Sequence, residues 1–279
     1  MTCWINGLFY DDGEGEIPVS DRGFLLGDGI FDTLLVLDGQ PQYLKKHCDR
    51  LRQNAEIMKL PVPEPFNDIA DIISELITKS GHNVGRSSLR TTLTRGSGPR
   101  GLDIPETCEP TLVFRLQPAP SIEPSANMKM CIARNTRRNE HSMLSQVKSL
   151  NYADPIIAID EARAKKCDNA ILLNSKEDVA CAANGNVYAL IDGQWLTPPI
   201  DDGVLGGTVR QVLIDEGIVR EVRISKDDLL SAEAAAFSNS LIGVVPIITI
   251  DDAEFDTFKA FETFGGRQWE CEASRKKAA

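Results

Sequence analysis

The chain has 279 residues, of which 42% are hydrophobic and 25% charged, a balance typical of a globular protein with one large domain or two ordinary ones. Its net charge of −11 disfavours a nucleic-acid backbone or an anionic membrane surface as partner, so an anionic ligand needs a locally built positive site. The longest apolar runs, such as residues 241–250, have about half of the ~20 residues that a membrane helix needs.

Cysteine and histidine usage narrows the setting further. The seven scattered cysteines include no CxxC pair, which indicates a reducing compartment with most of them acting as small core residues. The three histidines lie far apart, so no zinc site is predicted. Residues 1–7 show no basic segment before an apolar core, so a cytoplasmic location is expected.

The first half of the chain mixes short strands with two helices. Apolar residues recur at helical spacing over 43–59 and 67–79, which predicts two amphipathic helices. Asp38-Gly39 is a strong hairpin signal. Strands are expected at residues 3–10, 34–37, 88–95 and 111–116.

A proline-rich stretch then marks the boundary between two domains. Residues 117–125 contain three prolines and show neither a helical nor a strand period. The prediction is an N-terminal domain over 1–117, a linker over 118–126 and a C-terminal domain over 127–279.

The second half reads as a succession of strands with three helices. Asp154-Pro155 looks like an N-cap followed by proline at the first helical position, in a helix running to about residue 166. Glycines at 203–207 open a second helix, which ends near residue 216. Strands are expected at 129–133, 170–173, 179–183, 187–191, 195–196, 219–224, 235–237 and 244–250, with a short helix at 226–232.

Two segments offer chemistry from their residue types alone. Gly206-Gly207-Thr208-Val209 leads directly into a helix, whose free N–H groups and dipole suit a phosphate, although glycines of this kind more often serve only a tight loop-to-helix turn. Lys148 stands among apolar neighbours and near Arg134, Arg137 and Arg138 in sequence. A lysine becomes nucleophilic when its amine is desolvated or lies beside another cation.

Six ordered motifs give the chain a family resemblance. They are SDRGxxxGDGxFDT (residues 20–33), HxxRL (47–51), TRGxGPRG (94–101), KSLNY (148–152), LGGTVR (205–210) and SNSLxGVVP (238–246). Together they resemble the class-IV aminotransferase family over about residues 3–250. The family comprises pyridoxal-phosphate enzymes of fold type IV, including branched-chain and D-amino-acid aminotransferases and aminodeoxychorismate lyase. The resemblance therefore implies an α+β or α/β chain with a smaller N-terminal α/β domain and a larger C-terminal mixed-sheet pseudo-barrel domain.

The resemblance also implies roles for individual residues. Lys148 matches the lysine that forms the internal Schiff base with pyridoxal 5'-phosphate and shuttles protons, and Tyr152 matches the tyrosine on the cofactor's phenolic oxygen. The implied phosphate ligands are Arg50, the N–H groups of Thr208 and Val209, and the hydroxyl of Ser240, while Leu205 matches the leucine packed on the ring. Arg100 is the candidate for a substrate carboxylate. Arg95 is a second candidate for the substrate carboxylate, but a structural ion pair is the favoured role for it.

One position departs from the family pattern. Cys181 stands where the family usually carries a glutamate that pairs with the protonated pyridine nitrogen. A neutral thiol supplies no charge to hold that proton, and a thiolate needs a positive site because its ordinary pKa is near ~8.5. Cys181 is therefore compatible with a weaker electron sink, an altered reaction, or a cofactor-binding paralogue with little catalysis. No carboxylate lies between Asp178 and Asp192 to restore the pattern by a small shift.

The family hosts both elimination and transamination, and fold does not decide between them. The KSLNY form and the SNSLIGVVP run favour 4-amino-4-deoxychorismate lyase, which releases pyruvate and 4-aminobenzoate. The TRGxGPRG loop suits an aminotransferase for D-amino or branched-chain amino acids equally well. An amino-acid-like small molecule is the expected substrate, and the resemblance implies a homodimer.

Overall fold

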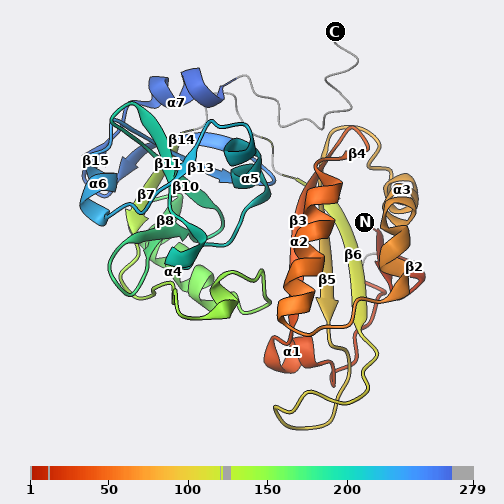
Figure 1. Cartoon of the computed structure of the whole chain (residues 1–279). Helices are drawn as coiled ribbons and strands as arrows, with labels where there is room; N and C mark the ends of the chain where they lie inside the picture. Colours follow the sequence, from red (N-terminus) through yellow and green to blue (C-terminus); the bar gives the residue numbers. More distant parts are fainter. Residues whose placement is uncertain (1, 12, 120, 122–126, 266–279) are drawn as a thin grey trace. The chain divides into compact units, whose positions relative to one another are not determined.

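The chain forms two compact units in a computed structural model that describes residues 2–11, 13–119, 121 and 127–265 (Figure 1). Among the described residues, unit 1 comprises 2–11, 13–119, 121 and 147–151, and unit 2 comprises 127–146 and 152–265. Most of the predicted linker, at residues 120 and 122–126, lies outside the described residues. The predicted domain boundaries therefore stay a prediction.

Unit 1 is an antiparallel sheet with helices packed on one of its faces. The sheet order is β2-β1-β6-β5-β3-β4. Helices α2 and α3 pack against it, and the short helix α1 lies before β3 (Figure 1). The elements are β1 (Thr2–Ile5), β2 (Leu8–Asp11), α1 (Arg22–Leu26), β3 (Gly29–Leu37), β4 (Gln40–Pro41), α2 (Leu44–Ile57), the 3-10 helix η1 (Glu64–Asp68), α3 (Ile69–Ser80), β5 (Arg86–Thr94) and β6 (Thr111–Pro118).

Side chains that alternate along these strands give the sheet two different faces. The first face carries apolar residues such as Leu34, Leu89 and Phe114, which join the helices in one buried core. The second face is defined by the intervening residues of the same strands, among them Phe31 and Arg90. The strands thus separate a structural face from a face that carries large polar side chains.

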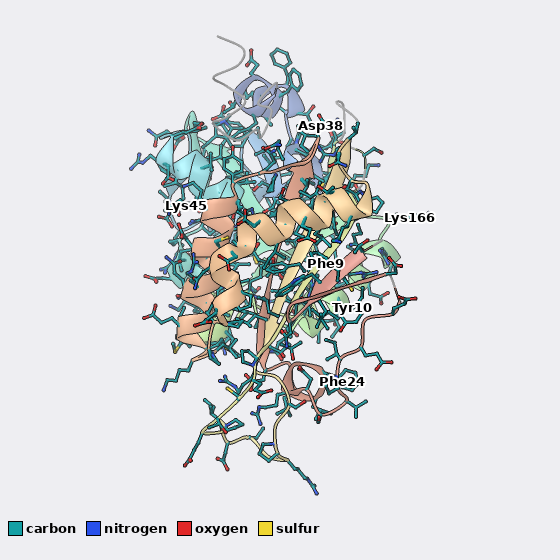
Figure 2. The ribbon with its side chains drawn as sticks, turned by 90° about the vertical axis from the view of Figure 1, so that its right-hand side faces the viewer. Phe9, Tyr10, Phe24, Asp38, Lys45 and Lys166 are labelled. Atoms are coloured by element: carbon teal, nitrogen blue, oxygen red, sulfur yellow. The ribbon has the colours of Figure 1, made fainter. Side chains whose placement is uncertain are left out.

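Three features of unit 1 differ from the sequence prediction. The single strand expected at residues 3–10 is a hairpin of β1 and β2, because Asn6 and Gly7 adopt φ of 44° and 102° and form the turn. Helix α1 was not predicted, since five residues are too few for a helical period. Strand β3 begins at Gly29 rather than near residue 34, because its early residues pair with β5. The turn predicted at Asp38 is confirmed; it joins β3 to β4 (Figure 2).

Unit 2 is a mixed sheet in the order β12-β11-β10-β13-β14-β7-β8-β9, with β15 paired to β14. Strand β7 runs parallel to both β8 and β14. An isolated bridge between Ala182 and Gly185 joins the end of β9 to the start of β10, so the sheet curls toward closure. The strands are β7 (Met128–Ile132), β8 (Asn169–Leu173), β9 (Val179–Ala182), β10 (Asn186–Ile191), β11 (Gln194–Thr197), β12 (Arg220–Glu221), β13 (Ala234–Asn239), β14 (Gly243–Ile250) and β15 (Ala253–Glu254).

Two predictions for unit 2 are wrong, one about the start of a helix and one about the length of a strand. The helices of this unit are η2 (Met143–Ser145), α4 (Ala153–Ala164), η3 (Ile200–Asp202), α5 (Thr208–Asp215), α6 (Lys226–Leu230) and α7 (Thr257–Phe264). Asp154 is not the N-cap of α4: Tyr152 occupies that position, and Asp154 lies in the first turn, where its charge suits the helix dipole. The strand expected at 219–224 shrinks to β12, because only Arg220 and Glu221 pair with β11.

The described part of the chain shows neither a membrane-spanning helix nor a cluster of metal ligands. None of its helices combines the length and the apolar character needed to cross a membrane. Its His, Cys, Asp and Glu side chains form no group of three or more that could hold a metal ion.

Candidate active site

The segment that contains Lys148 extends the edge of the unit 1 sheet at the start of β3. The N–H of Phe31 donates to the carbonyl of Lys148 at 2.9 Å, and the N–H of Leu150 donates to the carbonyl of Gly29 at 3.0 Å. Ile30 and Ser149 form an antiparallel bridge between them. Lys148 therefore lies opposite Phe31, on the second face of the sheet.

Two glycines of the GDG motif leave room for this segment. A Cβ at Gly29 would lie 2.8 Å from Leu150 Cδ1 and from the carbonyl oxygen of Leu93. Gly27 ends α1 with φ of 66°, and a Cβ there would lie 2.6 Å from Asn151 Oδ1. Side chains at these positions would push the lysine segment away from β3.

The charged residues of the first motif hold the loops around β3. Asp21 is fully buried and accepts hydrogen bonds from Thr94 Oγ1 and Thr111 Oγ1 at 2.8 and 2.7 Å. Asp28 accepts from the guanidinium groups of Arg22 and Arg95 at 2.8 Å. Although burial opposes it, these two arginines lower the pKa of Asp28. Asp21 and Asp28 therefore hold the loops that flank the lysine segment.

The aromatic ring of Phe31 contacts two cations. Lys148 Nζ lies 4.4 Å from the ring centroid, and the guanidinium carbon of Arg90 lies 3.7 Å from it. Both distances fit cation–π contacts. Proximity in sequence points instead to Arg134, Arg137 and Arg138 as the cations near Lys148. Arg90 was not predicted, although the alternation of β5 puts it on the same face as Phe31.

Behind Phe31, on the first face, Asp32 ties α2 to β3. Arg50 donates to both carboxylate oxygens of Asp32, at 2.9 Å through Nε and 2.8 Å through Nη2. His47 Nδ1 lies 2.6 Å from the same carboxylate. The two-point contact orients the guanidinium of Arg50. The resemblance implies that this arginine binds the phosphate group of the cofactor.

The charge states of this buried cluster follow from its composition. Burial alone would raise the pKa of Asp32, but Arg50, His47 and Lys148 together lower it well below its ordinary value. Burial also lowers the pKa of His47, and the neighbouring carboxylate does not offset that effect. The cluster thus holds an ionised aspartate, a charged arginine and a neutral imidazole that donates through Nδ1–H.

In unit 2, α5 begins with a bare backbone terminus. Its N-cap is Gly207, which supplies no side-chain cap, so the N–H groups of Thr208 and Val209 are presented at the positive end of the helix. Asn186 Nδ2 donates to the carbonyl of Leu205 at 3.0 Å, and a Cβ at Gly207 would lie 2.0 Å from Asn186 Oδ1. This terminus fits the phosphate of pyridoxal phosphate.

The turn between β13 and β14 offers a hydroxyl to the same kind of ligand. Tyr188 Oη and Ser238 Oγ lie 2.7 Å apart and are buried, and Asn239 Oδ1 caps the N–H groups of Leu241 and Ile242 at 3.0 Å. Ser240 lies half-buried at the tip of this turn. The turn is therefore rigidly framed around a serine that suits a phosphate oxygen.

Cys181 lies in an apolar layer of unit 2. It pairs with Leu172 across β8 and β9, and a bulge in β9 directs it toward the same cluster as Ala170 and Val204. Burial raises the pKa of Cys181, and the nearby charge of Arg138 does not offset this. The side chain is a neutral thiol, so the thiolate alternative is not supported.

The remaining predicted site residues lie in both units: Arg95 and Arg100 in unit 1, Tyr152 and Leu205 in unit 2. Arg95 is buried and donates to Asp28 and to the carbonyls of Met58 and Lys59, which agrees with the favoured ion pair. Arg100 is exposed on the loop between β5 and β6. Tyr152 starts α4, and Leu205 precedes α5.

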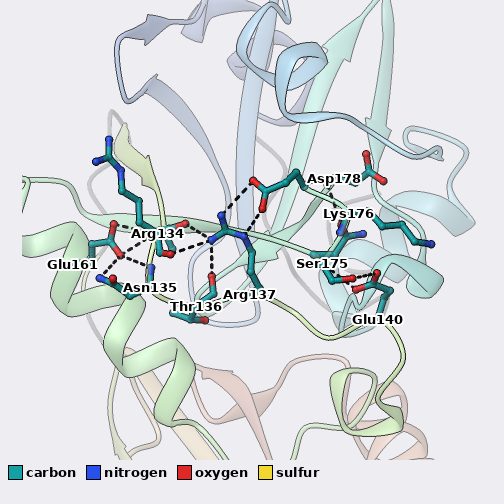
Figure 3. Close-up of polar contacts among 12 residues, drawn as sticks. Arg134, Asn135, Thr136, Arg137, Glu140, Glu161, Ser175, Lys176 and Asp178 are labelled. Atoms are coloured by element: carbon teal, nitrogen blue, oxygen red, sulfur yellow. Dashed lines mark hydrogen bonds and ion pairs between the residues drawn. The ribbon is translucent and has the colours of Figure 1, made fainter.

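The arginines that follow β7 serve unit 2 itself. Arg137 pairs with Glu177 at 2.9 Å, and the Arg134 N–H donates to Glu161 (Figure 3). Arg138 donates to the carbonyls of Gly203 and Ser145. All three hold loops of this unit together, which is a structural role that their sequence distance from Lys148 did not reveal.

Comparison with known proteins identifies the family. The profile described as "Amino-transferase class IV" matches residues 29–250. A Methanocaldococcus jannaschii protein named "Putative branched-chain-amino-acid aminotransferase" is 31% identical over 90% of this chain and 88% of its own length. The D-alanine aminotransferase of Staphylococcus haemolyticus is 27% identical over 89% and 88% of the two chains.

A solved structure shares both fold and sequence features. The "Putative 4-amino-4-deoxychorismate lyase" of Legionella pneumophila superimposes with a TM-score of 0.80, at 27% identity, over 88% of this chain and 91% of that one. The predicted fold class and cofactor are confirmed. This chain belongs to the class IV aminotransferase family, the fold type IV enzymes that use pyridoxal 5'-phosphate.

Proposed function

We propose that the chain is a 4-amino-4-deoxychorismate lyase that uses Lys148 as its catalytic base. The observation that carries this proposal is the buried, apolar setting of Cys181, which stands where the resemblance implies a glutamate and where burial raises the pKa of the thiol. When bound, pyridoxal phosphate is an electron sink: it withdraws the electron pair that remains on the amino-bearing carbon of the substrate after that carbon loses its proton. A thiol weakens that sink. An elimination that forms an aromatic ring depends less on the sink than two half-reactions of transamination do.

In the proposed reaction, Lys148 Nζ takes the proton from that carbon. The C–O bond to the enolpyruvyl group then breaks, the ring becomes aromatic, and the released enolpyruvate takes up a proton to become pyruvate. The charge of Lys148 is one of the causes that lower the pKa of Asp32, so an ionised carboxylate and the lysine act on each other electrostatically.

The proposal also assigns a role to each cofactor-binding residue. Lys148 would hold the cofactor covalently until the substrate's amino group replaces it there, which frees the Lys148 amine to take a proton, and Tyr152 would hold the cofactor's phenolic oxygen. Arg50, oriented by Asp32, binds the phosphate together with Ser240 and the N–H groups of Thr208 and Val209. Leu205 packs on the ring, and Arg100 and Arg95 stay substrate candidates, of which Arg95 is the weaker because Asp28 holds it.

An absorbance spectrum and a product assay test this function. The purified protein with added cofactor should show a band near the visible edge that disappears in Lys148→Ala. Pyruvate and 4-aminobenzoate should then form from aminodeoxychorismate without an amino acceptor. A protein that gains no band with cofactor would overturn the enzyme assignment of these residues.

A second candidate is an aminotransferase for branched-chain or D-amino acids. The names of the Methanocaldococcus and Staphylococcus relatives favour it. Formation of a keto acid only in the presence of an amino acceptor would select it over the lyase. A coloured protein that is inactive in both assays would instead support a paralogue that binds cofactor and catalyses little, and Cys181→Glu should then speed exchange of the α-proton.

We further propose that the chain is a homodimer in the cytoplasm. Helix α1 exposes three apolar side chains in a row, Phe24, Leu25 and Leu26, with exposed fractions of 74, 58 and 43%. Phe24 is labelled in Figure 2. Contiguous exposed apolar residues commonly mark a protein interface. Light scattering should report a dimer, and Phe24→Ser should shift it toward a monomer.

A further inference from the structure

In the proposed function, two separate elements of unit 2 bind one phosphate group. The N–H groups of Thr208 and Val209 open helix α5, and Ser240 lies on the turn that joins β13 to β14. Helix α5 packs on β13 (Figure 1). Because both elements must meet the same phosphate, their spacing has to be held to about half an ångström. The contacts that fix this spacing lie at the start of β10.

Asn186, the first residue of β10, holds the segment that leads into α5. Its side chain is buried, and its Nδ2 donates to the carbonyl of Leu205 at 3.0 Å. Its Oδ1 lies against Gly207, the N-cap of α5, where a Cβ would lie only 2.0 Å from that oxygen. Both ends of one carboxamide therefore contact the residues just before the first turn of the helix.

The backbone of the same residue is fixed to the strand that leads to Ser240. Asn186 pairs with Ser238 across β10 and β13. The preceding residue, Gly185, lies so close to β13 that a Cβ there would be 2.1 Å from the carbonyl oxygen of Ser238. Ser238 is itself fully buried, with its hydroxyl 2.7 Å from that of Tyr188. The start of β10 thus has little freedom to move relative to the end of β13.

We propose that Asn186 is a positioning residue that sets the spacing between the α5 terminus and the β13–β14 turn, so that both bind one phosphate group. It acts through Leu205 and Gly207, not by contact with the phosphate. Loss of its carboxamide lets the terminus shift and weakens recognition of the phosphate more than the rest of cofactor binding. This inference rests on the proposed phosphate-binding roles of Thr208, Val209 and Ser240.

The test compares two forms of the cofactor, pyridoxal 5'-phosphate and pyridoxal, which lacks the phosphate. Both carry the aldehyde that reacts with Lys148. The ratio of their dissociation constants, measured by titration of the cofactor band, therefore reports what the phosphate contributes, and we call this ratio the phosphate selectivity. In Asn186→Ala the phosphate selectivity should fall roughly 10-fold or more, since a single hydrogen bond to a charged group contributes at least that.

Asn174→Ala is the matched control. Asn174 is also fully buried in unit 2, where its Oδ1 accepts from the N–H groups of Lys176 and Asp178 at 2.9 and 3.0 Å in the turn between β8 and β9. Both substitutions remove buried hydrogen bonds and should lower the midpoint of thermal unfolding. Only Asn186→Ala should lower the phosphate selectivity. An equal loss of selectivity in the two variants would reduce Asn186 to a structural role and overturn the proposal.

Gly207→Ala tests the same contact from the other side, and it covers the case in which Asn186→Ala does not fold. Gly207 has φ of −71° and ψ of 145°, which alanine adopts without strain, so the new methyl group acts through its clash with Asn186 Oδ1. Phosphate selectivity should fall here too. In the double variant the methyl group has room, so the two losses should not add. Unchanged selectivity in Gly207→Ala, or losses that add, would overturn the role of this contact.

The same titrations keep this inference apart from the proposed function. A wild type that shows no cofactor band, or that binds pyridoxal as tightly as pyridoxal 5'-phosphate, fails the proposed function and this inference with it. A wild type with the band and with phosphate selectivity, beside a folded Asn186→Ala of equal selectivity, fails only the assignment of Asn186.

Discussion

Asp32 in β3 and Cys181 in β9 are buried to the same degree, with exposed fractions of 4 and 6%, yet their surroundings hold them in opposite states. Asp32 is enclosed by Arg50, His47 and Lys148, which outweigh the effect of burial and keep it ionised. Cys181 has apolar neighbours, and the charge of Arg138 does not offset the effect of burial, so the pKa of the thiol is raised. Burial alone therefore does not set the charge of a site residue; the neighbouring charges do.

The largest expected effect comes from removing the negative charge of Asp32. Asp32→Asn leaves the buried Arg50 without its anionic partner and replaces one acceptor oxygen by a donor, and should lower the free energy of unfolding by about 3–5 kcal/mol. Cofactor affinity should fall as well, because the guanidinium of Arg50 loses its orientation. Urea unfolding and cofactor titration measure the two effects.

Asp49→Asn is the matched control on α2. Asp49 pairs with Lys45 at the surface, and such a pair contributes little to stability. Equal destabilisation in the two variants would mean that the charge of Asp32 has no special role.

A smaller effect is expected where the lysine segment meets Gly27. Gly27 and Gly81 end their helices with nearly the same backbone, at φ of 66° and 70°, but only Gly27 has a neighbour at its missing Cβ. Alanine at either position should cost about 1 kcal/mol from the left-handed backbone. Gly27→Ala should cost about 1–3 kcal/mol more, through Asn151, and should weaken the cofactor band. Identical losses in thermal unfolding would refute tight docking of the segment.

Substitution of Cys181 is expected to change the free energy of unfolding by a similar or smaller amount. Cys181→Ser places a hydroxyl in an apolar layer and should cost about 1–3 kcal/mol. In the folded wild type, iodoacetamide at pH 8 should modify the half-buried Cys108 before Cys181, as read by mass spectrometry. Preferential labelling of Cys181 would show that its site favours the thiolate.

The smallest effect concerns pH and the imidazole beside Asp32. Folding lowers the pKa of His47, so below its ordinary pKa of ~6.5 the unfolded chain binds a proton that the folded chain resists. Stability should therefore fall as the pH drops from 7 to 5, by at most about 1.4 kcal/mol per pH unit. The aspartate acts in the same direction only at much lower pH, because its folded pKa is depressed.

Replacing His47 should remove this slope. His47→Asn keeps a donor toward Asp32 without a titratable ring, so its stability should stay level between pH 7 and 5. His141→Asn is the control, since that side chain is 75% exposed. A slope that survives in His47→Asn would assign the pH dependence to another group.

Motif and periodicity predicted the fold class, the two amphipathic helices and most strands, since these depend on local pattern. They missed the β1–β2 hairpin, whose turn at Asn6-Gly7 was taken as part of one strand. They also missed Arg90 beside Lys148, because that neighbourhood depends on the pairing of β3 with β5 and with a segment more than fifty residues downstream. Sequence proximity pointed to Arg137 and Arg138 instead, which hold loops in unit 2.

The membership of Val147–Asn151 in unit 1 limits how this protein can be divided. A fragment ending at the proline-rich stretch would lack the strand that pairs with Gly29–Phe31 and would expose a bare sheet edge, which is prone to aggregation. The complementary fragment would carry Lys148 away from the ring that it contacts. The two halves are therefore not exchangeable modules, and a chimera made with a relative must transfer the lysine strand together with the N-terminal sheet.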